Sequence, residues 1–199
     1  MIDFQQHCVI AMMLYAKYKT RNLQGVLGPG GATCDPATTT GSSNATGGAD
    51  TENEYSKYVC GLGLEGVFGG ICEFVEGVEI NNRVWKITDP DGSTRNVNAG
   101  TVSGWIKNIA AENGPFFDVV PTRVGGSNLK YYSDRYYQAS DNSLVLARSY
   151  SNSNEYGGVA YSGAGKYASS QDLAYGSRLA FRGTISEVSP EQFKKLPAL

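Results

Sequence analysis

The sequence predicts an α+β fold in which two helices accompany small antiparallel sheets and much irregular chain. The helices are predicted where apolar residues recur every three or four positions, over residues 1–20 and 102–109. Paired strands are predicted at 71–80 and 83–88, where apolar and polar side chains alternate. Further along, three short β-rich segments are separated by Gly or Ser: Leu144–Arg148, Gly158–Tyr161 and Arg178–Arg182.

The length and composition suit a single domain that spans residues 1–199. With 41% hydrophobic residues among 199, the chain can bury a sizeable core. Its net charge is −2, from 17 basic and 19 acidic residues, so no concentrated positive face is expected and we expect no nucleic-acid partner. No apolar run approaches the roughly 20 residues that a membrane-spanning helix needs, so we also expect no membrane span.

Loops and turns are predicted between these elements, and two further short elements are predicted as well. Residues 32–54 consist mainly of Thr, Ser, Gly, Asn and Ala, which predicts a surface loop or insertion. Turn residues at Asp89–Gly92 follow the second strand, and Asn113-Gly114 closes the second helix. A short strand is predicted at 116–120 and a capped terminal helix at 189–196. The apolar stripes of the two longer helices are Phe4, Cys8, Ala11, Met12, Tyr15 and Tyr18, and then Val102, Trp105, Ile106 and Ile109.

Residues that could carry chemistry are few. His7 is the single histidine and lies beside the apolar stripe of the first helix, so we expect it to have a packing or surface role, and a multi-histidine metal site is excluded. The four cysteines lie within the first 72 residues without zinc-binding spacing, which leaves buried thiols or a disulfide. We therefore predict no catalytic residue, no metal and no cofactor. Glu73 and Asp118 are the carboxylates on which a competing hydrolase hypothesis would depend.

Residues 149–177 have the composition of a binding surface. These 29 residues include seven Ser, five Tyr, five Gly and two Asn. Tyrosine offers a large amphipathic contact area at low entropic cost, and Ser, Gly and Asn adapt their hydrogen bonds, as in antibody paratopes. A flexible low-complexity loop would share this composition, but apolar residues at 144–146, 159–160 and 179–181 bracket and interrupt the segment. We therefore favour an ordered surface that binds another molecule non-covalently.

Three separated blocks resemble the variable proteins of diversity-generating retroelements, which are phage and bacterial proteins. The blocks are Tyr18–Gln24 with Gly28-Pro29-Gly30, then Gly69–Gly77, and finally Arg148 through the ending Gly176–Phe181. The central block departs from the family pattern, because Cys72 and Phe74 stand where aromatic residues such as tryptophan are typical. Together the blocks span nearly the whole chain.

The resemblance implies a C-type lectin-like fold of the formylglycine-generating-enzyme subtype, with a variable ligand-binding region at 144–182. It does not imply enzymatic activity, because the family's enzymes use cysteines late in the sequence and this chain has none after Cys72. In such proteins, mutagenesis of selected codons changes exposed side chains over a fixed backbone, so 157–160 and 178–179 are expected to pack as scaffold. The implied contact residues are Tyr150, Ser151, Asn152, Asn154, Tyr156, Tyr161, Tyr167, Ser169, Ser170, Asp172 and Tyr175.

The sequence thus predicts a non-catalytic ligand- or receptor-binding protein. Its expected partner is a host or cell-surface protein or glycan, and its expected location is the virion surface, on a tail or head fibre, or the bacterial cell surface. A homo-oligomer, or a place in a larger fibre or adhesin, agrees with this prediction. Two alternatives stay open: a glycan-active enzyme on the same fold, and a structural virion protein whose tyrosines pack against symmetry mates.

Overall fold

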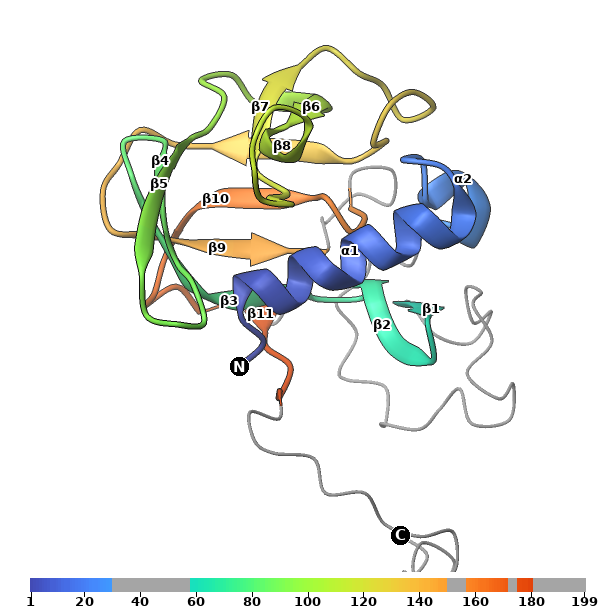
Figure 1. Ribbon diagram of the computed structural model, residues 1–199, viewed down its shortest axis with the longest axis horizontal. Coiled ribbons are helices and arrows are strands. Elements are labelled where there is room, and N and C mark those ends of the chain that lie inside the picture. The colour runs from blue at the N-terminus through green and yellow to red at the C-terminus, as the bar shows by residue number, and fades with distance from the viewer. Residues whose placement is uncertain (30–57, 150–156, 172–174, 181–199) are drawn as a thin grey trace, which may run out of the picture.

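The computed structural model describes residues 1–29, 58–149, 157–171 and 175–180 (Figure 1). Of these residues, 42% lie in strands and 16% in helices. Nine strands form one sheet that curls into a half-barrel, and helix α1 (Phe4–Tyr18) lies across it (Figure 1). The predicted α+β, C-type lectin-like fold with two helices and small sheets is therefore wrong, because the described chain is mainly β.

Most strands of the large sheet run antiparallel to their neighbours. Its members are β3 (Cys72–Asn81), β4 (Val84–Thr88), β5 (Thr94–Asn98), β6 (Gly104–Ile109), β7 (Pro121–Val124), β8 (Arg135–Gln138), β9 (Leu144–Arg148), β10 (Ser162–Tyr167) and β11 (Tyr175–Gly176). They follow the order β5-β4-β3-β9-β10-β8-β6-β7, with β11 paired to β3 outside this path. Two pairs are parallel, β10 with β8 and β11 with β3. A separate hairpin joins β1 (Tyr58–Gly61) to β2 (Leu64–Gly69).

Helix α1 confirms the predicted N-terminal helix. The Asp3 side chain accepts a hydrogen bond from the Gln6 amide at 2.7 Å, and the Gln6 side chain accepts one from the Asp3 amide, which forms a capping box. The helix ends at Lys19, whose φ of 53° is left-handed. Its buried side differs from the predicted stripe, because Met12 faces outward, whereas His7 and Leu14 face the core.

The predicted hairpin is also confirmed, with a third strand that the pattern did not predict. Strands β3 and β4 pair antiparallel, with Ile80 opposite Trp85. The chain then turns through Asp89–Gly92, where the Gly92 amide donates to the Asp89 carbonyl at 2.9 Å. Strand β5 returns along β4 and has few apolar residues, which is why alternation did not reveal it.

The predicted second helix is wrong, because residues 104–109 form strand β6. Its pairing with β7 is irregular on both sides of Asn108. Such bulges add a residue to one strand, so side chains three apart can face the same side of a sheet. Ile106 and Ile109 are both buried in this way, and their spacing imitates a helical period. The only helices among the described residues besides α1 are the short α2 (Gln24–Leu27) and the 3₁₀ turn η2 (Ala110–Glu112).

Of the remaining predicted strands, only Leu144–Arg148 is confirmed, as β9. Residues 116–120 form no strand, and β7 begins one residue later. Residues 158–161 form a turn before β10, and the described part of 178–182 is not a strand. The predicted loop at 32–54 and the helix at 189–196 lie outside the described residues.

The core lies between α1 and the inner, helix-facing side of the sheet. Trp85 is fully buried there, with its ring centroid 6.2 Å from that of Phe4 and 6.5 Å from that of Tyr136. Cys8, Cys60 and Cys72 are buried free thiols. None of the described helices is long and apolar enough to cross a membrane.

Both flanks of the described chain meet at β3. The Ile2 amide donates to the Arg178 carbonyl at 3.0 Å, and Asp3 forms a parallel bridge with Glu76 of β3. Strand β11 pairs with the beginning of β3. One strand in the middle of the sheet therefore holds segments from both ends of the described sequence (Figure 1).

Candidate ligand-binding face

The side of the sheet that faces away from α1 is built by alternation along β9. Leu144, Leu146 and Arg148 point into the core, so Val145 and Ala147 point to the opposite side. Pairing extends this outer side across the neighbouring strands, because Phe74 of β3 and Gly163 of β10 both lie opposite Ala147. The outer side of these three strands thus forms one continuous surface.

Aromatic rings cover that surface. Phe74 and Tyr175 stack with their ring centroids 5.2 Å apart and an interplanar angle of 14°. Both pack with Tyr161 against buried Cys72 and Ala147. The Lys166 ammonium lies 5.2 Å from the centroid of the Tyr175 ring, within the range of a cation–π contact.

Glycines on β10 make room for two of these rings. A Cβ atom at Gly163 would lie 3.5 Å from Cε1 of Tyr161, so this ring rests on the strand backbone. A Cβ atom at Gly165 would lie 2.5 Å from Cε1 of Tyr137, which leaves no space for any side chain there. Tyr137 itself is 56% exposed. We call Phe74, Tyr137, Tyr161 and Tyr175 the aromatic face.

The structure brings two of the predicted contact residues together and places three others elsewhere. Tyr161 and Tyr175 both belong to the aromatic face. Tyr167 ends β10, and with Ser169 and Ser170 it forms a turn in which Ser170 Oγ accepts from the Tyr167 amide at 3.1 Å. Since a strand rises about 3.3 Å per residue, this turn is roughly 20 Å from Tyr161 along the chain. The other predicted contact residues, Tyr150, Ser151, Asn152, Asn154, Tyr156 and Asp172, lie outside the described residues.

Sequence reasoning missed Phe74, Tyr137 and Lys166. Phe74 lies about 100 positions before Tyr175, so no local pattern connects them. A signal for Tyr137 existed in the dipeptide Tyr136-Tyr137: in a strand, one ring must face the core and the other must face away. The expectation that 157–160 would pack is confirmed, since all four residues are buried, whereas Leu179 is 95% exposed and does not pack.

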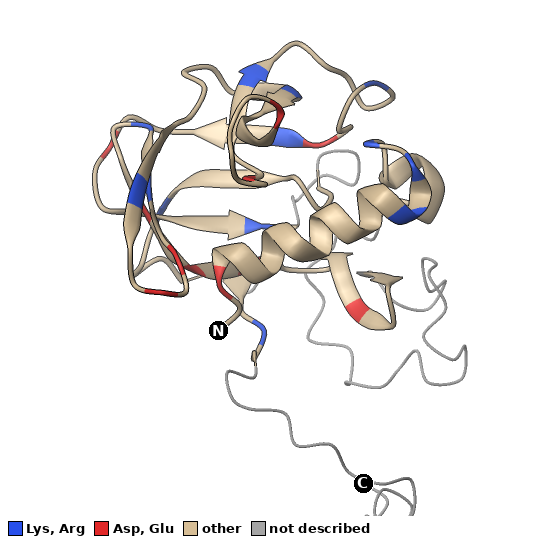
Figure 2. Cartoon of the chain, in the orientation of Figure 1, with Lys and Arg blue, Asp and Glu red and all other residues tan. Residues whose placement is uncertain are grey.

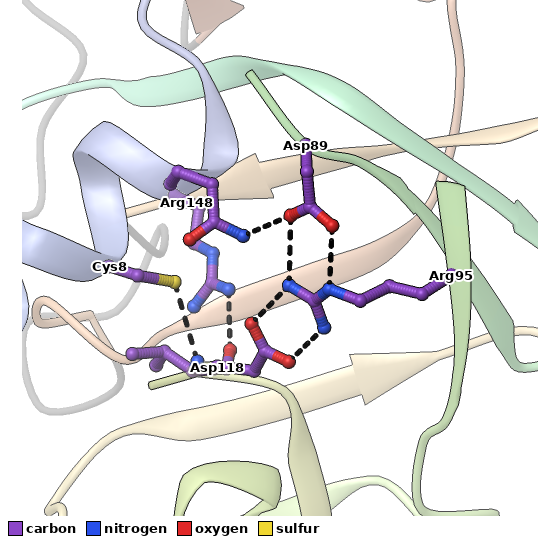
Figure 3. Close-up of polar contacts among 7 residues, drawn as sticks. Cys8, Asp89, Arg95, Asp118 and Arg148 are labelled. Atoms are coloured by element: carbon purple, nitrogen blue, oxygen red, sulfur yellow. Dashed lines mark hydrogen bonds and ion pairs between the residues drawn. The ribbon is translucent and has the colours of Figure 1, made fainter. Parts of the chain in front are cut away.

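Arg148 anchors the start of the Tyr- and Ser-rich segment from inside the core. It is fully buried, and its Nη2 donates to the Val119 carbonyl at 2.5 Å (Figure 3). The guanidinium also lies 5.3 Å from the ring centroid of Phe4 and 5.7 Å from that of Trp85. Burial lowers the pKa of Arg148 to about 10. Among the described residues, its Nε and Nη1 find no hydrogen-bond partner.

Arginines occupy the two carboxylates on which a hydrolase would depend. Asp118 makes a two-point contact with Arg95, whose Nε also donates to Asp89 at 2.9 Å (Figure 3). Glu73 accepts from Arg178 Nε at 2.9 Å, and burial raises the pKa of Glu73 while Arg178 opposes this shift. Glycoside hydrolases need two carboxyl groups that face a common substrate. Here, Asp118 and Glu73 belong to separate ion pairs.

No group of three or more His, Cys, Asp or Glu side chains that could hold a metal ion occurs in the part of the chain that the structure describes. The described site is therefore a surface of aromatic rings, one ammonium group and backbone, which suits non-covalent contact. No protein-family model, curated protein or solved structure matches this chain.

Proposed function

We propose that this chain is a non-catalytic binding protein whose aromatic face contacts the ligand. The observation that carries the proposal is that Phe74, Tyr161 and Tyr175 share one surface with the Lys166 ammonium, outside the main core. Half-buried tyrosine rings lose little entropy on binding and combine apolar area with a hydroxyl group. Tyrosine, together with tryptophan and arginine, is among the residue types that contribute most of the binding energy at protein interfaces.

The scaffold under this face supports the proposal. Rings that rest on glycine backbone or stack on each other are held in place before a ligand arrives, which reduces the entropic cost of binding. The flanking residues 149–156 continue the Tyr-, Ser- and Asn-rich composition. We propose that these residues extend the contact surface, and that they vary among related proteins as in the variable proteins of diversity-generating retroelements.

The proposed partner is a host or cell-surface protein or glycan, and the proposed location is a virion surface or a bacterial cell surface. A protein in either place must recognise molecules on another cell, and a rigid scaffold with exchangeable tyrosines suits that task. A nucleotide-level test addresses the origin of the variation. A near-repeat of the codons for 144–182 that differs only at adenines, beside a reverse-transcriptase gene, supports retroelement diversification, and a locus without them contradicts it.

Tyrosine substitution tests the binding role directly. The double variant Tyr161→Ala/Tyr175→Ala is compared with Tyr18→Ala/Tyr131→Ala, which removes two partly buried tyrosines that pack against the main core. Retention of the fluorescently labelled proteins on intact cells of a bacterial panel is measured by flow cytometry. We expect the first variant to lose at least about tenfold in retention while the second keeps it, since aromatic anchors typically contribute 2 kcal/mol or more.

Equal losses in both variants, or intact retention in the first, would contradict the proposal. Treating the cells with protease or with glycosidases before the measurement separates a protein receptor from a glycan receptor.

A second candidate function, assembly into a larger particle, is favoured by the outer side of α1. Val9, Met12 and Met13 are each more than 40% exposed there, and no charged residue occurs from Phe4 to Ala16. Figure 2 shows this stretch of α1 without charged residues. An uncharged surface can pair with its own copy across a two-fold axis without like-charge repulsion. Sedimentation of Met12→Lys/Met13→Lys tests this: a shift from oligomer to monomer supports assembly, and an unchanged monomer excludes it.

A further inference from the structure

Residues 157–160 interrupt the Tyr- and Ser-rich segment with four buried positions. Val159 and Ala160 are fully buried, and Gly157 and Gly158 are buried as well. The Tyr161 amide then donates to the Gly158 carbonyl at 3.0 Å, and Tyr161 emerges on the aromatic face. Whatever fixes these four residues therefore also fixes where Tyr161 points.

One contact comes from α1. His7 is buried, and its Nε2 lies 2.9 Å from the Val159 carbonyl oxygen. A carbonyl can only accept, so Nε2 must carry the proton and donate. Burial, together with the nearby Arg148, lowers the pKa of His7 to about 3, so the ring is neutral at physiological pH.

A second contact comes from the loop before β8. Asp134 is buried, and its Oδ2 accepts a hydrogen bond from the Ala160 amide at 2.8 Å. Its Oδ1 accepts from Nε2 of Gln24, on α2, at 2.6 Å. The same Gln24 nitrogen donates to the Ser133 carbonyl at 2.6 Å, which ties α2 to this loop.

Gly158 completes the arrangement by having no side chain. A Cβ atom at this position would lie 2.0 Å from Asp134 Oδ1 and 2.6 Å from its Cγ. Because these atoms belong to a buried carboxylate that is itself held by hydrogen bonds, they cannot move aside at low cost. Only glycine lets the carboxylate approach the backbone of 157–160 so closely.

We infer that His7, Asp134 and Gly158 form a positioning clamp that fixes the backbone of residues 157–160 and thereby sets where Tyr161 enters the aromatic face. The inference rests on the proposed function. The clamp touches the Val159 carbonyl, the Ala160 amide and the bare Cα of Gly158, and none of these depends on a side chain. Tyr161 therefore follows a fixed stretch of backbone and enters the aromatic face at a defined position.

Amide hydrogen exchange tests the clamp without any ligand. At pH 8, above the Asp134 pKa of about 7, both carboxylate oxygens accept. In Asp134→Asn one of them becomes a donor, so at this pH we expect the Ala160 and Tyr161 amides to exchange at least about tenfold faster. Amides of β9 should keep their wild-type rates. The matched control is Asp118→Asn, another buried carboxylate, which pairs with Arg95 and does not touch 157–160. It should leave the Ala160 and Tyr161 rates unchanged.

Two further variants complete the experiment. Gln24→Ala removes the hydrogen bonds to Asp134 Oδ1 and to the Ser133 carbonyl but keeps the bond between Asp134 and the Ala160 amide, so it should fold and accelerate the same two amides to a smaller extent. Replacing residues 150–156 with a Gly/Ser sequence should not alter these rates, because the clamp uses none of their side chains. Unchanged Ala160 and Tyr161 exchange in folded Asp134→Asn or Gln24→Ala would overturn the clamp, as would acceleration in the Gly/Ser variant. None of these results depends on whether the aromatic face binds cells.

Discussion

The two sides of the large sheet are built from the same strands and treat their side chains in opposite ways. On the inner side, Ile80, Trp85 and Leu146 are fully buried beneath α1. On the outer side, Phe74 and Tyr175 are half-buried, and they stack on each other without a covering helix among the described residues. One side is closed by buried aliphatic and aromatic side chains beneath α1, and the other carries partly exposed aromatic rings.

This difference separates stability from recognition. Inner side chains make most of their contacts with the rest of the protein, so replacing them should disturb folding. Outer rings keep much of their surface exposed and rest on backbone, so replacing them should disturb binding more than folding. An outer substitution that unfolds the protein, or an inner substitution that leaves its stability unchanged, would contradict this assignment of roles to the two sides.

The largest effect is expected for Trp85→Ala. Trp85 is fully buried and contacts the rings of Phe4 and Tyr136, so its truncation leaves a large cavity. We expect the free energy of unfolding to fall by about 3–5 kcal/mol, measured by urea denaturation with circular dichroism. Leu179→Ala is the control for a nearly fully exposed residue and should have almost no effect. A loss below about 1 kcal/mol for Trp85→Ala would contradict this division of the sheet.

The next effect is the pH dependence of stability that the buried clamp residues Asp134 and His7 produce. Burial raises the pKa of Asp134 from its ordinary value of 3.8 to about 7. The folded protein therefore holds a proton that the unfolded chain releases near pH 3.8, so this contribution to stability is present below that pH and is lost as pH rises towards 7. His7 acts in the opposite direction, because its lowered pKa makes stability fall as pH drops from 6.5 to about 3.

Comparison with Asp134→Asn isolates the Asp134 contribution. The difference in free energy of unfolding between wild type and variant should decrease by roughly 3–4 kcal/mol from pH 4 to pH 7, since one pKa unit corresponds to about 1.4 kcal/mol. Urea denaturation at several pH values measures it. A difference that stays constant over this range would show that Asp134 is ionised throughout.

A smaller effect is expected from the glycines beneath the aromatic face. Gly165→Ala places a Cβ atom 2.5 Å from Cε1 of Tyr137 and forces the ring outward, whereas Gly163→Ala makes only ordinary contacts at 3.4–3.5 Å. We expect a stability loss of about 1–2 kcal/mol for the first and close to none for the second. Thermal unfolding of the two variants side by side checks this, and equal losses would show that strand geometry matters more than ring position.

The smallest effect is expected for single rings of the aromatic face. Tyr175→Ala should lower the free energy of unfolding by about 1 kcal/mol, because it removes the stack on Phe74. Tyr137→Ala should cost less than about 0.5 kcal/mol, because that ring is more than half exposed. Urea denaturation distinguishes the two variants. A larger loss for Tyr137 would place this ring in the core rather than on a binding surface.

The sequence pattern was sufficient to predict an element where its buried residues recur with the regular spacing of a helix or a strand. Helix α1, the β3–β4 hairpin and β9 were predicted because their buried residues recur at regular spacing. Strand β6 was not, because bulges give Ile106 and Ile109 helical spacing. Strand β10 reads Ser-Gly-Ala-Gly-Lys-Tyr, a sequence with little intrinsic β preference, and its place between β9 and β8 decides its conformation.

The same limit applies to the candidate site. Composition singled out Tyr161 and Tyr175, but it could not find Phe74 or Tyr137, which reach the same face from strands distant in sequence. The clamp was equally hidden. A packing or surface role was predicted for His7, but its contact with the Val159 carbonyl, 152 positions away, follows only from the fold.

The hydrogen bond between the Ile2 amide and the Arg178 carbonyl has a consequence for protein engineering. The first and the last segments of the described residues are joined by this hydrogen bond, and both lie against β3. In a variant shortened to residues 2–180, these neighbouring ends would permit circular permutation, with new ends opened in an exposed turn such as Asp91-Gly92. A permuted chain would carry its fusion partner at that turn and leave the segment around Arg178 continuous with α1.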